Sequence, residues 1–259
     1  MKIISVTNNK GGAGKTTFAE LLALSLSTQG HKVLCIDCDP QGSLTDALRI
    51  DNGLGFDLED LSALKAMPES DIIFPEGTIN SLILGKNENY FEYTKYHNIK
   101  LVSSDFSFDK MYTNADPFSF TRILKNLKER FEAFDYVIFD APPTLQGITQ
   151  AAIMASDKIF VPCEISEKSI RATIHTFTRL EELQKKGEAV FVIDKSNKTK
   201  YAENLLEAFL ILLCKKSAFV KGHKITKNTE IQKLTAGRLK LTDSKIEKYL
   251  KPVLEILGA

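Results

Sequence analysis

The 259-residue sequence has little of several features that would each point to a particular class of protein. It has no tryptophan, only four cysteines, and a formal charge of +1, which gives no global field to attract nucleic acid or membranes. Its longest uninterrupted apolar run, residues 208–214, is far shorter than the roughly 20 residues that cross a bilayer. A disulfide scaffold and a membrane-spanning protein are therefore disfavoured, and a reduced, cytoplasmic compartment is expected.

The cysteines give weak support for a metal site. Cys35 and Cys38 have the CxxC spacing, but they lie on and just after an apolar run, with no second pair and no histidine cluster. Free cysteine is usually a small buried hydrophobic residue, so a structural role is the simpler interpretation. A protein that carries a metal or a cluster at Cys35 and Cys38 is the alternative.

Strand-like apolar runs alternate with helix-length stretches along most of the chain. The clearest helix, residues 166–184, carries Ile170, Ile174, Phe177 and Leu180 on one face. Several strand candidates are continuously apolar, as expected for strands covered on both faces. The pattern predicts an α/β fold, with a doubly wound, mostly parallel sheet and helices on both faces. The strand candidates are residues 3–7, 32–37, 99–103, 136–140, 158–162 and 189–194.

No linker, repeat or low-complexity block divides the chain, so one domain is predicted over residues 1–259. Residues 51–98 are rich in glycine and proline and are interpreted as an irregular excursion between strands. A final helix is predicted over residues 242–257. Lysine and glutamate mix on its polar face and Pro252 interrupts it, which favours packing on the core over a membrane-surface anchor. The chain begins directly with a strand pattern, so no signal peptide is expected.

A glycine-rich segment follows the first predicted strand and opens a helix. Its glycines let the backbone turn tightly around an anion, and the helix adds its positive N-terminal end. In a phosphate loop of this kind, Lys15 supplies charge to the β- and γ-phosphates of ATP, Thr16 supplies a hydroxyl to Mg²⁺, and Thr17 reaches a neighbouring phosphate oxygen. The segment consists of Lys10, Gly11, Gly12, Ala13, Gly14, Lys15, Thr16 and Thr17.

The segment departs from the common Walker loop at two positions. Asn9 stands where the first glycine usually lies, and an additional lysine, Lys10, precedes the double glycine. One loop presents Lys15 to its own nucleotide, so Lys10 is expected to point elsewhere. A charge-matching argument directs it toward a second nucleotide in a facing subunit.

Three acids follow two further predicted strands. Asp37 and Asp39 stand in the sequence Asp-Cys-Asp-Pro-Gln-Gly, and Asp140 ends the apolar run of residues 136–140 and precedes Ala-Pro-Pro. The carboxyl ends of parallel strands open onto one crevice, so these acids are expected beside the phosphate loop. There one carboxylate orients a water for attack while others hold Mg²⁺ or its waters. A plain turn or helix cap is the alternative for Asp37 and Asp39.

These residues resemble the ParA family of plasmid and chromosome partition ATPases, in its small, Soj-like form, which has a deviant Walker A loop. The shared elements are the loop at residues 10–17, Asp-Cys-Asp-Pro-Gln-Gly at 37–42, Asp-Ala-Pro-Pro at 140–143 and the stretch at 155–162. The resemblance runs from Met1 to about Leu180. The Asp-Pro-Gln element separates this family from the division-site and iron–sulfur relatives that share the deviant loop.

The resemblance implies an ATP hydrolase that is slow without its partner. Two ATP-bound subunits would face each other, with Lys10 of each touching the other's nucleotide. Asp39 matches the hydrolytic aspartate, and Lys10 and Lys15 complete the expected catalytic set. Thr16, Asp37 and Asp140 are the expected metal ligands. The dimer would bind DNA without sequence preference, associate with the nucleoid and release DNA when a ParB-like protein stimulates hydrolysis; no membrane partner is expected.

The C-terminal third carries the predicted DNA contacts. Lysines on flexible stems suit salt-sensitive, sequence-independent phosphate contacts, whereas a solvated lysine-rich face is the alternative. Glu230 stands where a DNA-contacting arginine of the family is expected. This residue favours a second hypothesis, a ParA-like ATPase that positions a protein cargo or acts as a regulator without binding DNA. The predicted DNA contacts are Lys195, Lys198, Lys200, Lys221, Lys224 and Lys227.

Overall fold

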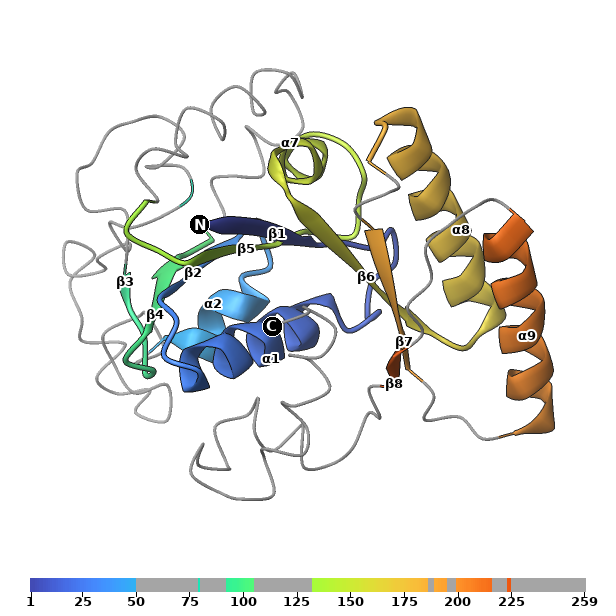
Figure 1. Cartoon of the computed structure of the whole chain (residues 1–259), viewed down its shortest axis with the longest axis horizontal. Helices are drawn as coiled ribbons and strands as arrows, with labels where there is room; N and C mark the ends of the chain where they lie inside the picture. The colour runs from blue at the N-terminus through green and yellow to red at the C-terminus, as the bar shows by residue number, and fades with distance from the viewer. Residues whose placement is uncertain are drawn as a thin grey trace, which may run out of the picture.

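The computed structural model describes residues 1–49, 79, 92–104, 132–185, 189–194, 199–215 and 223–224. Among these residues the strands form one eight-stranded sheet in the order β3-β4-β2-β5-β1-β6-β7-β8 (Figure 1). Every neighbouring pair is parallel except β3 and β4 at one edge. The strands are β1 (Lys2–Val6), β2 (Val33–Asp37), β3 (Glu92–Tyr93), β4 (Ile99–Val102), β5 (Tyr136–Asp140), β6 (Lys158–Glu164), β7 (Ala189–Asp194) and β8 (His223–Lys224).

Helices cover both faces of the sheet. Alternate residues of the central strands point to opposite faces, as the period of two of a strand requires. Ile4 therefore packs with the first two helices, whereas Ile3 packs with the helix that follows β5. The first face carries α1 (Lys15–Thr28) and α2 (Ser43–Leu48), and the second carries α7 (Ile148–Ala155), α8 (Glu167–Glu182) and α9 (Lys200–Lys215) (Figure 1).

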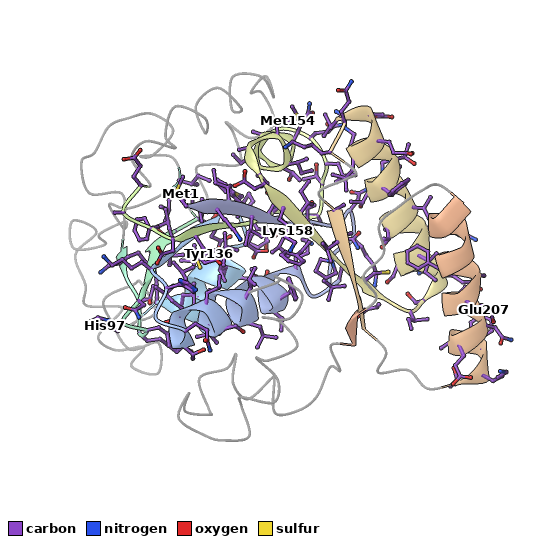
Figure 2. The ribbon with its side chains drawn as sticks, in the orientation of Figure 1. Met1, His97, Tyr136, Met154, Lys158 and Glu207 are labelled. Carbon is purple, nitrogen blue, oxygen red and sulfur yellow. The ribbon has the colours of Figure 1, made fainter. Side chains whose placement is uncertain are left out.

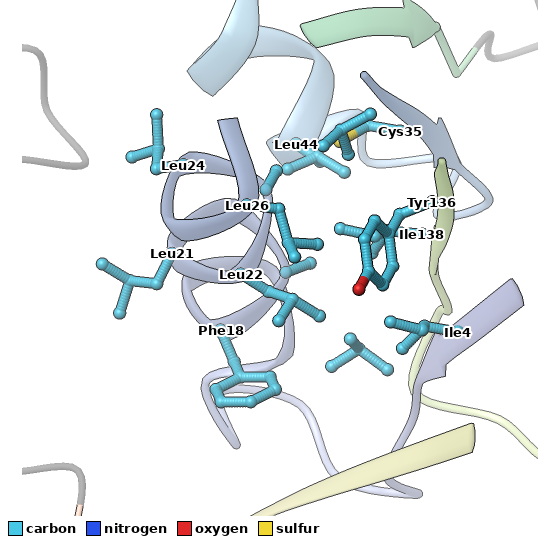
Figure 3. Packing of buried hydrophobic residues seen from close by; sticks show 14 of the residues in the cluster. Ile4, Phe18, Leu21, Leu22, Leu24, Leu26, Cys35, Leu44, Tyr136 and Ile138 are labelled. Carbon is cyan, nitrogen blue, oxygen red and sulfur yellow. The ribbon is translucent and has the colours of Figure 1, made fainter. Parts of the chain in front are cut away.

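The side chains separate into a buried interior and a polar margin. Figure 2 shows Tyr136 over the sheet beside α1 and α2, and Glu207 on the outer side of α9. Within the interior, Phe18 and Leu22 of α1 face Ile4 and Ile138 of the sheet (Figure 3). Burying a side chain of this size stabilises the fold by about 1.5–3 kcal/mol. This packing fixes α1, and with it the loop that precedes α1.

The fold predicted from the sequence is confirmed. Six of the parallel strands lie within two residues of the predicted ranges, whereas the short parallel strand β8 was not predicted, and the helix predicted over 166–184 is α8. Cys35 and Cys38 are free, fully buried, and packed in hydrophobic clusters on opposite faces of the sheet. The final helix predicted over 242–257 and most of the excursion at 51–98 lie outside the described residues. No helix in the described part of the chain is long and apolar enough to cross a membrane.

Candidate nucleotide-binding site

The phosphate loop connects the end of β1 to the start of α1. α1 begins at Lys15, and its N-cap, Gly14, has a φ of 82°. Gly12 also has a positive φ, 72°, a backbone conformation that residues with a Cβ adopt only at a cost. The first N–H groups of α1 have no intrahelical carbonyl to bind. Together with the positive end of the helix dipole, they form a site for an anion.

Lys15 is a buried cation at the base of this loop. Its side chain is 7% exposed, and Nζ donates a hydrogen bond of 3.1 Å to the carbonyl oxygen of Lys10. Burial lowers the pKa of Lys15, whereas the charges of Asp140 and Asp39 raise it. The ammonium group is therefore held between an anion-binding loop and two carboxylates, in the position that a phosphate-binding lysine needs.

A cavity of about 600 Å³ opens over the phosphate loop. Its lining includes loop residues 11–17, the apolar side chains of Phe18 and Val192, and the carboxylates of Asp39 and Glu164. Sites for cofactors and small molecules are concave, mostly apolar, and about 300–1,000 Å³ in volume. The cavity therefore has the size and the mixed lining of a nucleotide site, with the phosphate loop at its polar end.

The register of the sheet brings two of the predicted acids together. β2 and β5 are neighbours, and Asp37 lies opposite Asp140 at the last residue of each strand. On the other side of β5, Asp140 is the register partner of Val6, the last residue of β1. The phosphate loop and both acids therefore start from the same edge of the sheet, where the sequence predicted them.

Both carboxylates are withdrawn from solvent. Burial raises the pKa of Asp37 to about 6, although hydrogen bonds from Thr45 and from the backbone of Asp39 lower it. Burial also raises the pKa of Asp140 well above its usual value, and the charge of Asp37 raises it further. The neighbouring Thr16 and Lys15 lower the pKa of Asp140. The pair is therefore electrostatically costly as long as both groups are ionised.

The residues at this edge fit a divalent cation. Neither carboxylate oxygen of the buried Asp140 makes a well-formed hydrogen bond. Adjacent buried carboxylates are stabilised when a cation shares their oxygens, and Mg²⁺ prefers such hard oxygen ligands. Asp140 and the neighbouring hydroxyl of Thr16, which interact with each other, can serve in this way. Asp37 differs, because its oxygens already accept three hydrogen bonds from the protein.

Asp39 is the one predicted acid that lines the cavity. Its backbone N–H donates to Asp37 Oδ1 at 3.1 Å, and its own Oδ1 accepts a hydrogen bond of 3.0 Å from the N–H of Gln41. An Asx turn of this kind holds a carboxylate in place and leaves its second oxygen available. Of the three predicted acids, Asp39 is therefore the one with access to a ligand that lies over the phosphate loop.

Lys10 does not line the cavity over its own loop. Its Nζ lies 2.9 Å from Oε2 of Glu164, in an ion pair whose side chains are 24% and 31% exposed. Glu164 is the last residue of β6 and belongs to the cavity lining. Within one chain, Lys10 is thus held by an acid at the rim of the nucleotide cavity. Its predicted contact with a facing subunit stays a prediction.

Three residues of the site escaped the sequence analysis: Thr45, Asn8 and Glu164. Thr45 and Asn8 act through tertiary contacts with residues far along the chain, which no local pattern announces. Glu164 could have been found, because a strand that continued past Pro162 would have ended at Glu164 on the same edge as the other acids. The predicted strand stopped at residue 162 because proline usually ends strand pairing.

Most of the predicted DNA contacts lie outside the described residues. Lys200 and Lys224 are the exceptions. Lys200 begins α9, and its Nζ is 3.7 Å from Oε2 of Glu203 in a strongly exposed pair. Lys224 lies in β8, at the edge of the sheet. Their role in DNA binding stays a prediction, as it does for Lys195, Lys198, Lys221 and Lys227.

Comparisons with known proteins agree with this site. The maintenance of carboxysome distribution protein A of Gloeothece citriformis is 33% identical over 72% of this chain and 66% of that protein. The sporulation initiation inhibitor protein Soj of Bacillus subtilis is 28% identical over 71% of this chain and 66% of its own length. The matched segment thus spans just under two thirds of these relatives.

Solved structures match over almost the whole chain. An ATP complex of a Cyanothece McdA variant has a TM-score of 0.75 and 25% identity, and the match covers 100% of this chain and 96% of that one. A plasmid partition protein of Borrelia burgdorferi bound to AMPPNP has a TM-score of 0.73 and 20% identity, over 99% and 98% of the two chains. The predicted cofactors, ATP and Mg²⁺, agree with the ligands of such structures: these two hold ATP and AMPPNP, and a cobyrinic acid a,c-diamide synthase of Mycobacterium smegmatis (TM-score 0.68, 20% identity, 99% of this chain and 94% of that one) holds ADP and magnesium.

A family model described as an AAA domain matches residues 1–193, which include the phosphate loop and all three acids. Proteins with the names Soj and ParA are among the relatives of this chain. The resemblance inferred from the motifs is therefore confirmed, and the chain belongs to the ParA-like family of P-loop ATPases.

Proposed function

We propose that this chain is a partition ATPase, which forms a homodimer with ATP and in that state binds DNA without sequence preference. The observation that carries the proposal is the meeting of Lys15, Asp39 and the buried acid Asp140 at one edge of the sheet, around a nucleotide-sized cavity. Relatives named for partition, such as the chromosome partitioning protein ParA of Myxococcus xanthus, support it.

The residues of the cavity divide the chemistry of hydrolysis among them. Lys15 and the N–H groups at the start of α1 bind the phosphates of ATP. Asp39, which lines the cavity, orients the attacking water. Thr16 and Asp140 would hold Mg²⁺, which neutralises charge on the phosphates when it is bound. Asp37, which the sequence also predicted as a metal ligand, already accepts three hydrogen bonds within the chain, and we propose that it holds the backbone of Asp39 in place instead.

The remaining parts of the cycle follow from the proposed dimer. Lys10 of each subunit would reach the nucleotide of the other. Hydrolysis is expected to be slow until a ParB-like centromere-binding protein stimulates it, and the ATP-bound dimer is expected on the nucleoid. The lysines of the C-terminal third would contact DNA phosphates, which explains how a protein of net charge +1 still binds DNA.

A second candidate function is the positioning of a protein cargo. The observation that favours it is the 33% identity to the maintenance of carboxysome distribution protein A of Gloeothece citriformis. Glu230, at a position where an arginine was expected, also favours a ParA-like ATPase that works without DNA. ATP binding and dimerisation would be the same in both functions, so DNA binding separates them.

The test is the binding of a non-specific DNA duplex to the full chain, with ATP and with ADP, by fluorescence anisotropy. Partition function predicts binding with ATP alone, and an affinity that falls steeply between about 50 and 200 mM salt as counterions are released. Dimerisation by ATP, measured by light scattering, without DNA binding in either nucleotide would select cargo positioning. Absence of both dimerisation and DNA binding would contradict both functions.

Two substitutions assign the cavity residues in the same assays. Lys15→Ala removes the phosphate-binding ammonium, so ATP should no longer cause dimerisation. Asp39→Ala leaves the phosphate loop intact, so the dimer should form and hydrolyse ATP at least about tenfold more slowly. An Asp39→Ala protein with the turnover of the wild type would show that Asp39 is not the hydrolytic acid.

A further inference from the structure

Thr45 occupies a buried junction below the nucleotide cavity. It lies in the first turn of α2 and is 3% exposed. Its backbone N–H and its hydroxyl both donate to Oδ2 of Asp37, each at 2.8 Å. The same hydroxyl accepts a hydrogen bond of 2.9 Å from the backbone N–H of Ser104. One side chain therefore joins the end of β2, the start of α2 and the segment that follows β4.

The hydrogen bonds continue from Asp37 to Asp39. Asp37 Oδ1 accepts from the N–H of Asp39 at 3.1 Å, so one oxygen of Asp37 binds Asp39 and the other binds Thr45. The residue between them, Cys38, is fixed by a backbone hydrogen bond of 2.9 Å to the carbonyl of Asp140. Asp37 is thus the link between Thr45 on one side and the backbone of Asp39 on the other.

The oxygens of Asp37 are less available to a ligand than those of the equally buried Asp140, because they already accept three hydrogen bonds from the protein. The N-cap residue of α2, Gly42, has no side chain to cap the helix. The carboxylate of Asp37 caps it instead, because it accepts a hydrogen bond from the N–H of Thr45. Since the cap also holds Asp39, the position of Asp39 depends on how Asp37 is oriented. The hydroxyl and the backbone N–H of Thr45 together hold Oδ2 of Asp37.

We infer that Thr45 is a positioning residue for ATP hydrolysis: its hydroxyl orients Asp37, and Asp37 in turn fixes Asp39 over the phosphate loop. The inference rests on the proposed function, in which Asp39 orients the attacking water. Thr45 does not line the cavity, so it acts on the hydrolytic step and not on nucleotide binding. Small displacements of a catalytic group have large effects on rate, so a contact that acts on Asp39 only through Asp37 can still change kcat.

The test compares Thr45→Val with Thr45→Ser in the full chain with saturating Mg²⁺ and ATP. Valine keeps the shape of threonine but removes the hydroxyl, and serine restores it. We expect Thr45→Val to lower kcat by roughly 10- to 100-fold, with KM and the Kd of a fluorescent ATP analogue within about twofold of wild type. Thr45→Ser should recover kcat to within about threefold of wild type.

A control at an exposed threonine tests whether removing any hydroxyl from a helix changes the reaction, whereas Thr45→Ser separates positioning from packing. Thr28 donates a hydroxyl hydrogen bond of 2.8 Å to the carbonyl of Ser25, at the end of α1 remote from the phosphate loop. Thr28→Val should leave kcat and KM at wild-type values. If Thr45→Val does not fold, Thr45→Cys replaces it, because a thiol of similar size is a weaker donor and should also lower kcat.

Two outcomes overturn the inference. A folded Thr45→Val or Thr45→Cys protein with the kcat of the wild type shows that the hydroxyl has no part in hydrolysis. A Thr45→Val protein that loses kcat and ATP affinity together, and that serine does not rescue, shows a purely structural role. Asp39→Ala distinguishes a failure of this inference from a failure of the proposed function. If the proposed function is wrong, the Asp39→Ala protein is fully active; if only the role of Thr45 is wrong, Asp39→Ala still lowers kcat.

Discussion

Glu20 is a carboxylic acid buried in the helix that follows the phosphate loop. It lies in α1, is 1% exposed, and its Oε1 has no hydrogen-bond partner. Burial raises the pKa of Glu20 to about 8, and the charge of Lys95 opposes this only in part. Near neutral pH the folded protein therefore keeps a proton on Glu20 that the unfolded chain releases.

This proton makes the stability of the protein depend on pH. Below the ordinary glutamate pKa of about 4.5, Glu20 is neutral in both the folded and the unfolded state. Between about 4.5 and 8 the folded state binds more protons, so the free energy of unfolding falls as pH rises. The loss attributable to Glu20 amounts to roughly 3 kcal/mol between pH 4.5 and pH 7.

Glu20→Gln should remove this pH dependence, since an amide does not titrate. Urea unfolding at pH 5 and pH 8 measures it: the wild type should lose about 3 kcal/mol more than the variant over this interval. Glu207→Gln is the matched control, because this side chain is exposed on α9 (Figure 2), and its pH dependence should equal that of the wild type. Equal losses in the wild type and Glu20→Gln would contradict the prediction.

Among the structural elements, α8 is attached to the phosphate loop by polar groups. Asn8 Nδ2 donates to the carbonyl of Pro162 at 2.6 Å and to the hydroxyl of Thr173 at 3.1 Å. The N–H of Asn9 donates to the hydroxyl of Thr176 at 3.1 Å. Both threonines are fully buried in α8. The helix is therefore joined to the residues just before Lys10 by hydrogen bonds as well as by apolar contacts.

Asn8→Ala tests how much this attachment stabilises the fold. The substitution leaves the buried Pro162 carbonyl and the Thr173 hydroxyl without the amide that they now bind, which should lower the free energy of unfolding by about 1–3 kcal/mol. Asn98→Ala, at a partly exposed turn, should change it by less than about 0.5 kcal/mol. Chemical denaturation measures both variants. Equal stabilities would show that the amide of Asn8 is dispensable.

The sequence predicted the elements well because the apolar signal of a doubly buried strand is strong. It placed Ile170, Ile174, Phe177 and Leu180 on one face of α8; Ile174 is partly buried there and the other three are buried. It missed Thr173 and Thr176, whose burial follows from partners on the phosphate loop and not from their own hydrophobicity. Helical periodicity predicts which residues are apolar and buried, but it does not identify polar residues that are buried by partners.

The end of β6 shows a second limit of the same kind. The sequence ended this strand at Pro162, but β6 continues to Glu164 because its pairing with β7 extends to that residue. The pairing of β1 with β6 ends at Phe160, so Pro162 removes no hydrogen bond from that side, and its carbonyl accepts from Asn8 instead. Whether a proline ends a strand depends on which neighbouring strand its nitrogen faces. The sequence of the strand alone does not contain this information.

At the scale of the molecule, the order of the sheet explains which site residues were predictable. The phosphate loop, Asp37 and Asp140 follow strands that are adjacent in space, so the rule that parallel strands share one carboxyl edge was enough to place them together. The rule does not say which acid lines the cavity. That distinction between Asp37 and Asp39 depends on Thr45 and Ser104, which are distant from each other in sequence. The prediction of one domain over residues 1–259 stays a prediction.

The ion pair between Lys10 and Glu164 bears on the proposed dimer. If Lys10 reaches the nucleotide of a facing subunit, it must first leave Glu164, whose Oε2 is 2.9 Å from its Nζ. Partly exposed pairs of this kind contribute about 0.2–1 kcal/mol. Breaking the Lys10–Glu164 pair therefore makes dimerisation slightly less favourable. A neutral residue in place of Glu164 removes this cost.

Glu164→Gln should consequently strengthen ATP-dependent dimerisation by up to about 30-fold in Kd, because each of the two subunits releases its Lys10 at a cost lower by up to about 1 kcal/mol. Sedimentation or light scattering across a concentration series, with ATP and Mg²⁺, measures this Kd. The control Glu182→Gln breaks a different partly exposed pair, with Arg179 on α8, and should leave dimerisation unchanged. Weaker dimerisation in Glu164→Gln would instead mean that Glu164 holds Lys10 in the position that the dimer needs.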